Sequence, residues 1–226
     1  LFTKNRVQPI QNYPQELLNS LKNTLPETAE NKPTVCLLTP GLYNSAYFEH
    51  AFLADQMGIE LVQGNDLKVV DGFLAMRTTQ GHQKVDVLYK RLDDDFLDPL
   101  NFNEKSSLGV PGLFDVYRKG RVTIANAPGT GIADDKAMYS FIPEIVQFYS
   151  GEFPLLQNVP TWRCSIKDHL QYVLDNINEL VIKQVHGSGG YGMLIGPTAT
   201  KKDISNFKKK LIATPENYIA QPTLSL

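Results

Sequence analysis

Residues 180–195 read LVIKQVHGSGGYGMLI, and this stretch decides how the rest of the chain is interpreted. An apolar run is followed by a glycine-rich turn and a second short apolar run, which is the pattern of strand, hairpin and strand. Three of the glycines match G-x-G-x-x-G, but a dinucleotide-binding fingerprint requires a helix after them. Here the second run ends at Gly196-Pro197, so the context argues against a Rossmann site and predicts a glycine-rich β-hairpin.

The hairpin has two interpretations. Glycines let backbone N–H groups approach an anion closely, and Lys183, four residues before the first glycine, would add a fixed positive charge on a polyphosphate. The alternative is a plain tight hairpin whose glycines only supply positive φ, with Lys183 on the exposed side of an edge strand. A second lysine, Lys136, stands in the first turn of a predicted helix, which we expect Asp134 to cap. A cation there opposes the helix dipole, which favours a functional role for Lys136.

Other nucleotide and catalytic motifs are absent from the sequence. In protein kinases the lysine lies downstream of the glycines and H-R-D and D-F-G follow, whereas here the lysine lies upstream and neither triplet occurs. No P-loop and no G-x-S-x-G elbow occurs. The four histidines lack zinc spacing, and the two cysteines make no disulfide framework.

Composition is that of an ordinary globular protein, with 42% hydrophobic and 20% charged residues among 226. The net charge of −2 and the pI near 6.1 give no electrostatic reason to expect nucleic acid or a membrane surface as a partner. The paucity of cysteine fits a reducing cytoplasm. The chain opens on Leu1 and closes in an apolar stretch, so we expect both ends to be cuts in a longer polypeptide.

A predicted βαβ unit precedes these motifs. An apolar run at 34–38 predicts a buried strand, a helix capped by Asn44 or Ser45 extends to about Met57, and 59–62 forms the next strand. The loop after the first strand lies at the carboxyl edge, where α/β proteins usually bind ligands. It is either a substrate pocket or a capped helix with ordinary surface polar groups. The polar residues that the loop and the start of the helix would offer to a pocket include Glu49 and His50. The candidate substrate-binding residues are Tyr43, Asn44, Ser45 and Tyr47.

Further along, Asp71-Gly72 predicts a hairpin turn and residues 85–92 predict a strand that ends at Arg91. Asp93, Asp94 and Asp95 follow. A cluster of this kind could bind a metal or an ammonium group, but three consecutive aspartates cannot all face one ion. A solvated loop with a helix cap is the alternative.

Three segments in order, NAPGTGIADDK (126–136), VIKQVHGSGGYGM (181–193) and YIAQPTL (218–224), resemble the ATP-grasp fold. The segments LTPGLYNSAYFEHAFLADQMGIELVQG (38–64) and YKRLDDDFLDPL (89–100) resemble the circularly permuted ATP-grasp type 2 family, often described as related to glutathionylspermidine synthase. The expected fold is α/β, a βαβ-containing substrate-side subdomain followed by part of an ATP-grasp fold with a glycine-rich β-hairpin flap. The expected divisions are 1–33 (N-terminal helix and linker), 34–126 and 127–226.

The resemblance implies an ADP-forming ligase that joins a carboxylate to an amine through an acyl-phosphate made with ATP. Lys136 and Lys183 would hold the ATP phosphates, and Gln221 with its strand would lie along the adenine. Arg91, as the catalytic residue, would face the acyl-phosphate or the substrate together with the 44–47 loop. The mobile flap would consist of Gly187, Ser188, Gly189, Gly190 and Gly192. Mg²⁺ would be held by an E-D-N segment that this chain lacks, so no metal ligand is expected within it.

Two alternatives to the ligase stay open. One is a non-catalytic nucleotide-binding or scaffold module that keeps the ATP-grasp shape. The other is an inactive relative that binds only a peptide. We expect the isolated 226 residues to bind nucleotide weakly or not at all, and not to turn over.

Overall fold

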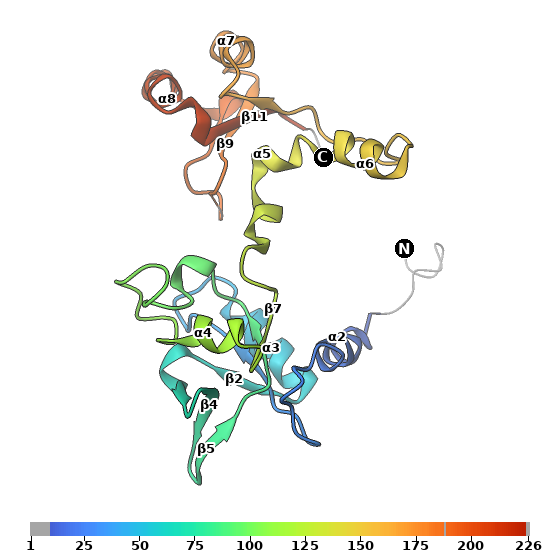
Figure 1. Cartoon of the computed structure of the whole chain (residues 1–226). Coiled ribbons are helices and arrows are strands. Elements are labelled where there is room, and N and C mark those ends of the chain that lie inside the picture. Colours follow the sequence, from blue (N-terminus) through green and yellow to red (C-terminus); the bar gives the residue numbers. More distant parts are fainter. Residues whose placement is uncertain (1–9, 188, 225–226) are drawn as a thin grey trace. The chain divides into compact units, whose positions relative to one another are not determined.

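The computed structural model describes residues 10–187 and 189–224, and it confirms an α/β fold with parallel and antiparallel sheets. Packing divides the chain into two compact units, Leu1–Thr130 and Gly131–Leu226 (Figure 1). The predicted N-terminal helix is α2 (Tyr13–Lys22), which buries Leu18 and Leu21 in the first unit. The three-part division expected from the sequence stays a prediction.

A four-stranded parallel sheet lies in the first unit. In spatial order its strands are β2 (Glu60–Val62), β1 (Val35–Leu38), β6 (Val87–Lys90) and β7 (Thr123–Ala125). Strand β1 is buried at every residue, because a parallel strand is covered on both faces. The helix α3 (Tyr47–Met57) connects β1 to β2 and ends at Gly58 in the left-handed conformation, so the predicted βαβ unit is confirmed.

The prediction that Asn44 or Ser45 caps α3 was wrong. The residue at the cap position is Ala46, and no side chain caps the helix. The Asn44 carboxamide oxygen instead accepts a hydrogen bond from the Ala46 N–H at 2.9 Å. This local turn satisfies the asparagine before the helix begins, which is a common competitor of capping.

A three-stranded antiparallel sheet completes the strands of the first unit. Its strands are β3 (Leu67–Val70), β4 (Phe73–Thr78) and β5 (Gly81–Lys84). The turn at Asp71-Gly72 has φ of 51° and 77°, as a two-residue hairpin requires. The single strand predicted over 85–92 begins later, at β6, because the chain changes sheets at Val85 and Asp86. The Val85 N–H bonds to β4, and the Asp86 N–H bonds to the Thr34 carbonyl beside β1.

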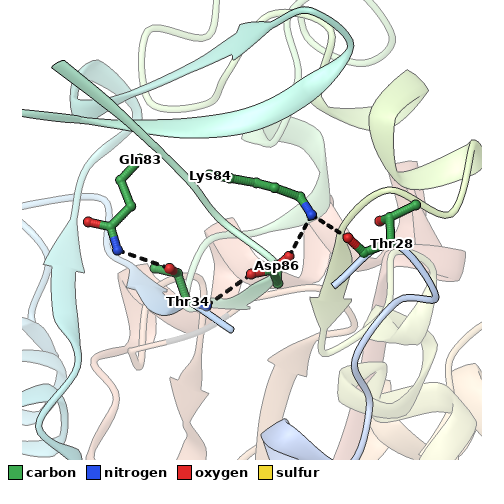
Figure 2. A network of polar contacts seen from close by, with 5 residues as sticks. All are labelled: Thr28, Thr34, Gln83, Lys84 and Asp86. Atoms are coloured by element: carbon green, nitrogen blue, oxygen red, sulfur yellow. Dashed lines mark hydrogen bonds and ion pairs between the residues drawn. The ribbon is translucent and has the colours of Figure 1, made fainter. Parts of the chain in front are cut away.

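A polar network surrounds that change of sheet (Figure 2). The Asp86 carboxylate is buried, accepts from the Thr34 N–H at 3.0 Å and pairs with the Lys84 ammonium at 3.0 Å. Lys84 also donates to the Thr28 carbonyl at 2.5 Å, and Gln83 donates to the Thr34 hydroxyl at 3.0 Å. The network therefore ties the linker before β1 to both sheets.

Asp98 organises the loops beyond β6. Its carboxylate is fully buried and accepts four hydrogen bonds of 2.9–3.1 Å. Two donors are local, and two are the N–H groups of Gly112 and Phe114, at the start of α4 (Leu113–Arg118). The Asp98-Pro99 pair is typical of a chain break, and the structure shows that this carboxylate also fixes where α4 begins.

The second unit has a four-stranded sheet with antiparallel pairs. In spatial order its strands are β10 (Leu194–Ile195), β9 (Leu180–Gln184), β11 (Tyr218–Pro222) and β8 (Trp162–Arg163). The predicted strand, glycine hairpin and strand are thus confirmed as β9 and β10. One face of this sheet packs into a core with Val173 of α7 (Lys167–Asp175) and with Phe207 and Leu211 of α8 (Lys201–Ala213).

Shorter elements complete the chain. Two helices follow the break between the units, α5 (Lys136–Tyr139) and α6 (Ile142–Ser150). Single 3₁₀ turns lie at Gly64–Asp66, Asp94–Phe96, Thr130–Asp134, Gly196–Thr198 and Pro215–Asn217. Within the described ranges, no helix is long and apolar enough to cross a membrane.

We predict that Asp98→Ala lowers the free energy of unfolding of the first unit by about 3 kcal/mol, because buried N–H donors lose a charged acceptor. Urea denaturation measures this loss. The matched control is Asp93→Ala, at an exposed aspartate of the same loop, which should cost no more than about 0.5 kcal/mol. Equal effects of the two substitutions would contradict the role given to Asp98.

Candidate functional site

The register of β9 and β11 places Lys183 and Gln221 on one face of the second sheet. Ile182 is paired with Ala220, and both are buried against the helices. Side chains alternate between the two faces along a strand, so Lys183 and Gln221 project from the opposite face. They are diagonal neighbours across the two strands, a distance that long side chains can span.

A chain of hydrogen bonds runs across this face. The Lys183 ammonium donates to the carboxamide oxygen of Gln221 at 2.8 Å. The Gln221 NH₂ group donates to the Thr161 hydroxyl at 2.9 Å, and Thr161 donates to the Val159 carbonyl at 2.9 Å. All of these side chains are half-buried. The structure thus brings together two residues that the sequence predicted and one, Thr161, that it did not.

Lys136 is attached to the same hairpin by its backbone and its side chain. Its N–H donates to the Val185 carbonyl at 3.2 Å, and its ammonium donates to the Gly187 carbonyl. The helix cap is Asp135, whose carboxylate accepts from the N–H groups of two residues in α5, so the prediction of Asp134 was wrong. A lysine is tolerated in this first turn because its charge is directed away, toward the hairpin, and α5 is only four residues long.

The conformation of the hairpin glycines fits both an anion-binding hairpin and a plain tight hairpin. Gly189, Gly190 and Gly192 have φ of 62°, 78° and 66°, values that other residues rarely adopt. They are exposed, which leaves their backbone free to approach a ligand. Gly187 holds the Lys136 ammonium, and a side chain on it would lie 3.1 Å from the Gln184 Cβ. Ser188, predicted as part of the flap, lies outside the described residues.

The two lysines carry charge without a matching anion. Each ammonium is held by a neutral carbonyl oxygen, Lys136 by the hairpin backbone and Lys183 by Gln221. Across residues 10–187 and 189–224, neither lysine forms an ion pair. Both are half-buried, where electrostatic attraction is stronger than in open water. This end of the sheet can therefore bind a polyanion.

Arg163 is a further cation on the same sheet face that the sequence analysis missed. It pairs with Ile219, the partner of Lys183, and its guanidinium lies 4.0 Å from the ring centroid of Phe141. The only signal was the alternation Thr161-Trp162-Arg163-Cys164, in which the apolar members face the core. Without the register to β11, that alternation did not reveal which neighbours the polar members meet.

The predicted substrate-side residues lie in the first unit. Arg91 follows β6, and its N–H donates to the Leu38 carbonyl at the end of β1 at 2.8 Å. The loop after β1 starts from the same carboxyl edge, so the structure brings Arg91 and this loop to one sheet edge. Tyr43, Asn44 and Ser45 are exposed, whereas Tyr47 is half-buried in the first turn of α3.

Beneath that loop, Thr39 and His50 form a buried pair that the sequence analysis did not identify. The Thr39 hydroxyl lies 2.9 Å from the His50 Nδ1 atom and accepts from the Gly41 N–H at 3.2 Å. Both side chains are at most 3% exposed. Burial, and then the charge of Arg91, lower the pKa of His50, which opposes its protonation. The hydrogen bond between Thr39 and the neutral imidazole thus fixes the first residues of the loop.

The acidic cluster after Arg91 is a structural loop. Asp94 pairs with Lys90 at 2.7 Å and accepts from the Gly129 N–H at 2.7 Å, while Asp93 and Asp95 are exposed. No group of three or more His, Cys, Asp or Glu side chains suited to a metal ion occurs in the described part of the chain.

An open hollow of about 930 Å³ in the first unit was also not predicted. It is lined by two segments, 24–28 and 117–127 without Arg121. It contains none of the candidate site residues, and no motif in the sequence indicated it.

With both sites described, the comparison with protein families is informative. The model for "circularly permuted ATP-grasp type 2" matches residues 1–226. The chain belongs to this family, as the sequence motifs predicted.

The chain is also similar to longer relatives and, more distantly, to a solved structure. An uncharacterised protein of Synechocystis is 54% identical over 226 residues, which are all of this chain and 47% of that protein. A Frankia alni protein named as a candidate glutamate–cysteine ligase is 40% identical over 94% of this chain and 25% of its own length. The chain therefore spans less than half the length of these relatives. A D-alanine–D-alanine ligase from Helicobacter pylori is similar with a TM-score of 0.45 and 8% identity, over 86% of this chain and 64% of that one.

We predict that the first unit loses stability as the pH falls below 6.5, the ordinary pKa of histidine. The pKa of His50 is lower in the folded state, so below pH 6.5 the unfolded chain binds more protons and unfolding becomes more favourable. His50→Gln should flatten this part of the curve of melting temperature against pH.

His82→Gln is the control, because His82 is exposed on β5 and should leave the curve unchanged. A curve of identical slope in the His50 variant would show that this imidazole does not titrate as described.

Proposed function

We propose that the full-length protein carrying this chain is an ATP-dependent carboxylate–amine ligase that forms ADP and an amide bond through an acyl-phosphate. The observation that carries this is the pair of lysines beside the glycine hairpin, both held by neutral carbonyl oxygens and half-buried. Membership of the ATP-grasp family supports it, and so does the name of the Frankia relative.

The reaction consists of two displacements. A carboxylate oxygen attacks the γ-phosphorus of ATP and ADP leaves, which gives the acyl-phosphate. The amine nitrogen then attacks the acyl carbon, phosphate leaves and the amine loses a proton. Negative charge moves onto phosphate oxygens in both steps, so the contribution of Lys136 and Lys183 is positioning and charge neutralisation. Magnesium, which the family implies, would be held by residues outside the described part, and we assign no step to it.

The remaining roles follow the same proposal. Gln221 and β11 lie along the adenine, and the hairpin with Gly187, Gly189, Gly190 and Gly192 covers the phosphates. Backbone amides exposed by glycine suit this role.

On the substrate side, Arg91 neutralises the acyl-phosphate. The loop residues that contact the acid or the amine are Tyr43, Asn44, Ser45 and Tyr47. The substrates are a small-molecule or peptide carboxylate and an amine, of the kind joined by glutathionylspermidine synthase-like enzymes. The full-length protein acts in the cytoplasm, and the isolated chain does not turn over.

A second candidate is a non-catalytic nucleotide-binding or scaffold module. It is favoured by the positive φ of the hairpin glycines, which a tight turn alone explains. The two candidates differ in turnover, because only the ligase releases ADP.

We predict that Lys183→Ala in the full-length protein weakens ATP binding at least tenfold and abolishes ADP release, because one of two phosphate charges is lost. Calorimetry with ATP and magnesium measures binding, and a coupled ADP assay with a panel of acids and amines measures turnover. Lys209→Ala, on the exposed face of α8, is the control and should change neither.

Unchanged binding and turnover in the Lys183 variant would remove Lys183 from the site. ATP binding by the unsubstituted protein without ADP release from any acid and amine pair would favour the scaffold module.

A further inference from the structure

Gln221 occupies the middle of the polar sheet face. Its strand, β11, lies between β9, which carries Lys183, and β8, which Thr161 immediately precedes. Lys183 therefore contacts the carboxamide from one side, and Thr161 contacts it from the other. The side chain is held laterally by both neighbours.

The direction of each hydrogen bond in this chain is determined by its two ends. The Val159 carbonyl can only accept, so the Thr161 hydroxyl donates to it and presents a lone pair to Gln221. The Lys183 ammonium can only donate, so it requires the oxygen of the carboxamide. Both ends demand the same orientation, with the Gln221 oxygen toward β9 and its NH₂ group toward β8.

This orientation fixes which end of the Gln221 carboxamide can accept a further hydrogen bond and which end can donate one. A carboxamide oxygen has two lone pairs and its nitrogen has two hydrogens, and the lateral contacts use one of each. One acceptor position and one N–H remain, and because the oxygen and the nitrogen are adjacent, the two can meet the same edge of a base. Adenine presents a donor at its 6-amino group beside the acceptor N1, whereas guanine presents the reverse, with an acceptor at O6 beside the donor N1–H. A carboxamide of fixed direction can therefore distinguish the two bases.

We propose that Thr161 is a positioning residue that fixes the Gln221 carboxamide so that the site selects 6-aminopurine nucleotides over guanine nucleotides. This inference rests on the proposed nucleotide site with Gln221 beside the base. Thr161 itself touches no ligand and acts through Gln221.

Two substitutions at Thr161 test the role of its hydroxyl group separately from the shape of its side chain. Thr161→Val keeps the β-branched shape and removes the hydroxyl, so the Gln221 NH₂ group loses its acceptor and the carboxamide is held from one side only. Thr161→Ser keeps the hydroxyl. A matched control is Thr198→Val, at an exposed threonine of the same unit whose hydroxyl makes one long local bond of 3.3 Å.

The experiment measures ATP and GTP dissociation constants by calorimetry on the full-length protein and its variants. We expect the unsubstituted protein to prefer ATP, and Thr161→Val to reduce the ratio of ATP to GTP affinity by about fivefold. Thr161→Ser and Thr198→Val should stay within about twofold. A second measurement on the nucleotide-free protein is the solvent-exchange rate of the Gln221 side-chain NH₂ by NMR, which should rise in Thr161→Val alone.

The outcomes distinguish this inference from the proposed function. If the unsubstituted protein binds ATP but Thr161→Val keeps its affinity ratio, the selecting role of Thr161 is wrong and the nucleotide site stands. If the unsubstituted protein binds neither ATP nor GTP, both the proposed function and the selecting role are overturned. An unchanged NH₂ exchange rate in Thr161→Val would disprove the positioning itself.

Discussion

The register between β9 and β11 is the constraint on which the second unit depends. Pairing Ile182 with Ala220 buries both against α7 and α8. The same pairing leaves Lys183 and Gln221 on the other face, since the side-chain period of a strand is two. A register slip of one residue would bury Lys183 in the apolar core and expose Ile182. Both changes would destabilise the second unit. The hydrophobic core therefore positions the charged site through the register of the two strands.

Much of this unit could be predicted from local patterns. The apolar runs, the glycine turn and the absence of a helix after it specified the hairpin, and Lys183 stood out because it interrupts an apolar strand. Thr161 and Arg163 could not be found in this way. Arg163 belongs to a strand of two residues and Thr161 immediately precedes it, and their importance comes from lying beside β11, about 60 residues later in the chain. Short sequence patterns carry no information about such pairings.

In the first unit, the features that the sequence did not predict correctly have a similar cause. The βαβ unit and the Asp71-Gly72 turn follow from local signals, whereas the split of the predicted strand depends on where the chain leaves one sheet for another. Nothing in the sequence indicated that the carboxylates of Asp86, within the strand predicted over 85–92, and Asp98 are buried. What distinguishes them is their partners, the linker before β1 for one and the start of α4 for the other. Polar residues that organise loops are chosen by tertiary structure, and composition does not reveal them.

The use of carbonyl oxygens to hold Lys136 and Lys183 has a practical consequence. A carbonyl supplies a dipole that orients an ammonium group but no charge that cancels it. The positive potential around the hairpin is therefore open to any multivalent anion in solution. If the proposed phosphate site is correct, phosphate and sulfate buffers would compete for it, and ionic strength would govern the strength of that competition. Ligand measurements on this protein are best made in dilute buffers of monovalent anions, where the site is left to the molecule under test.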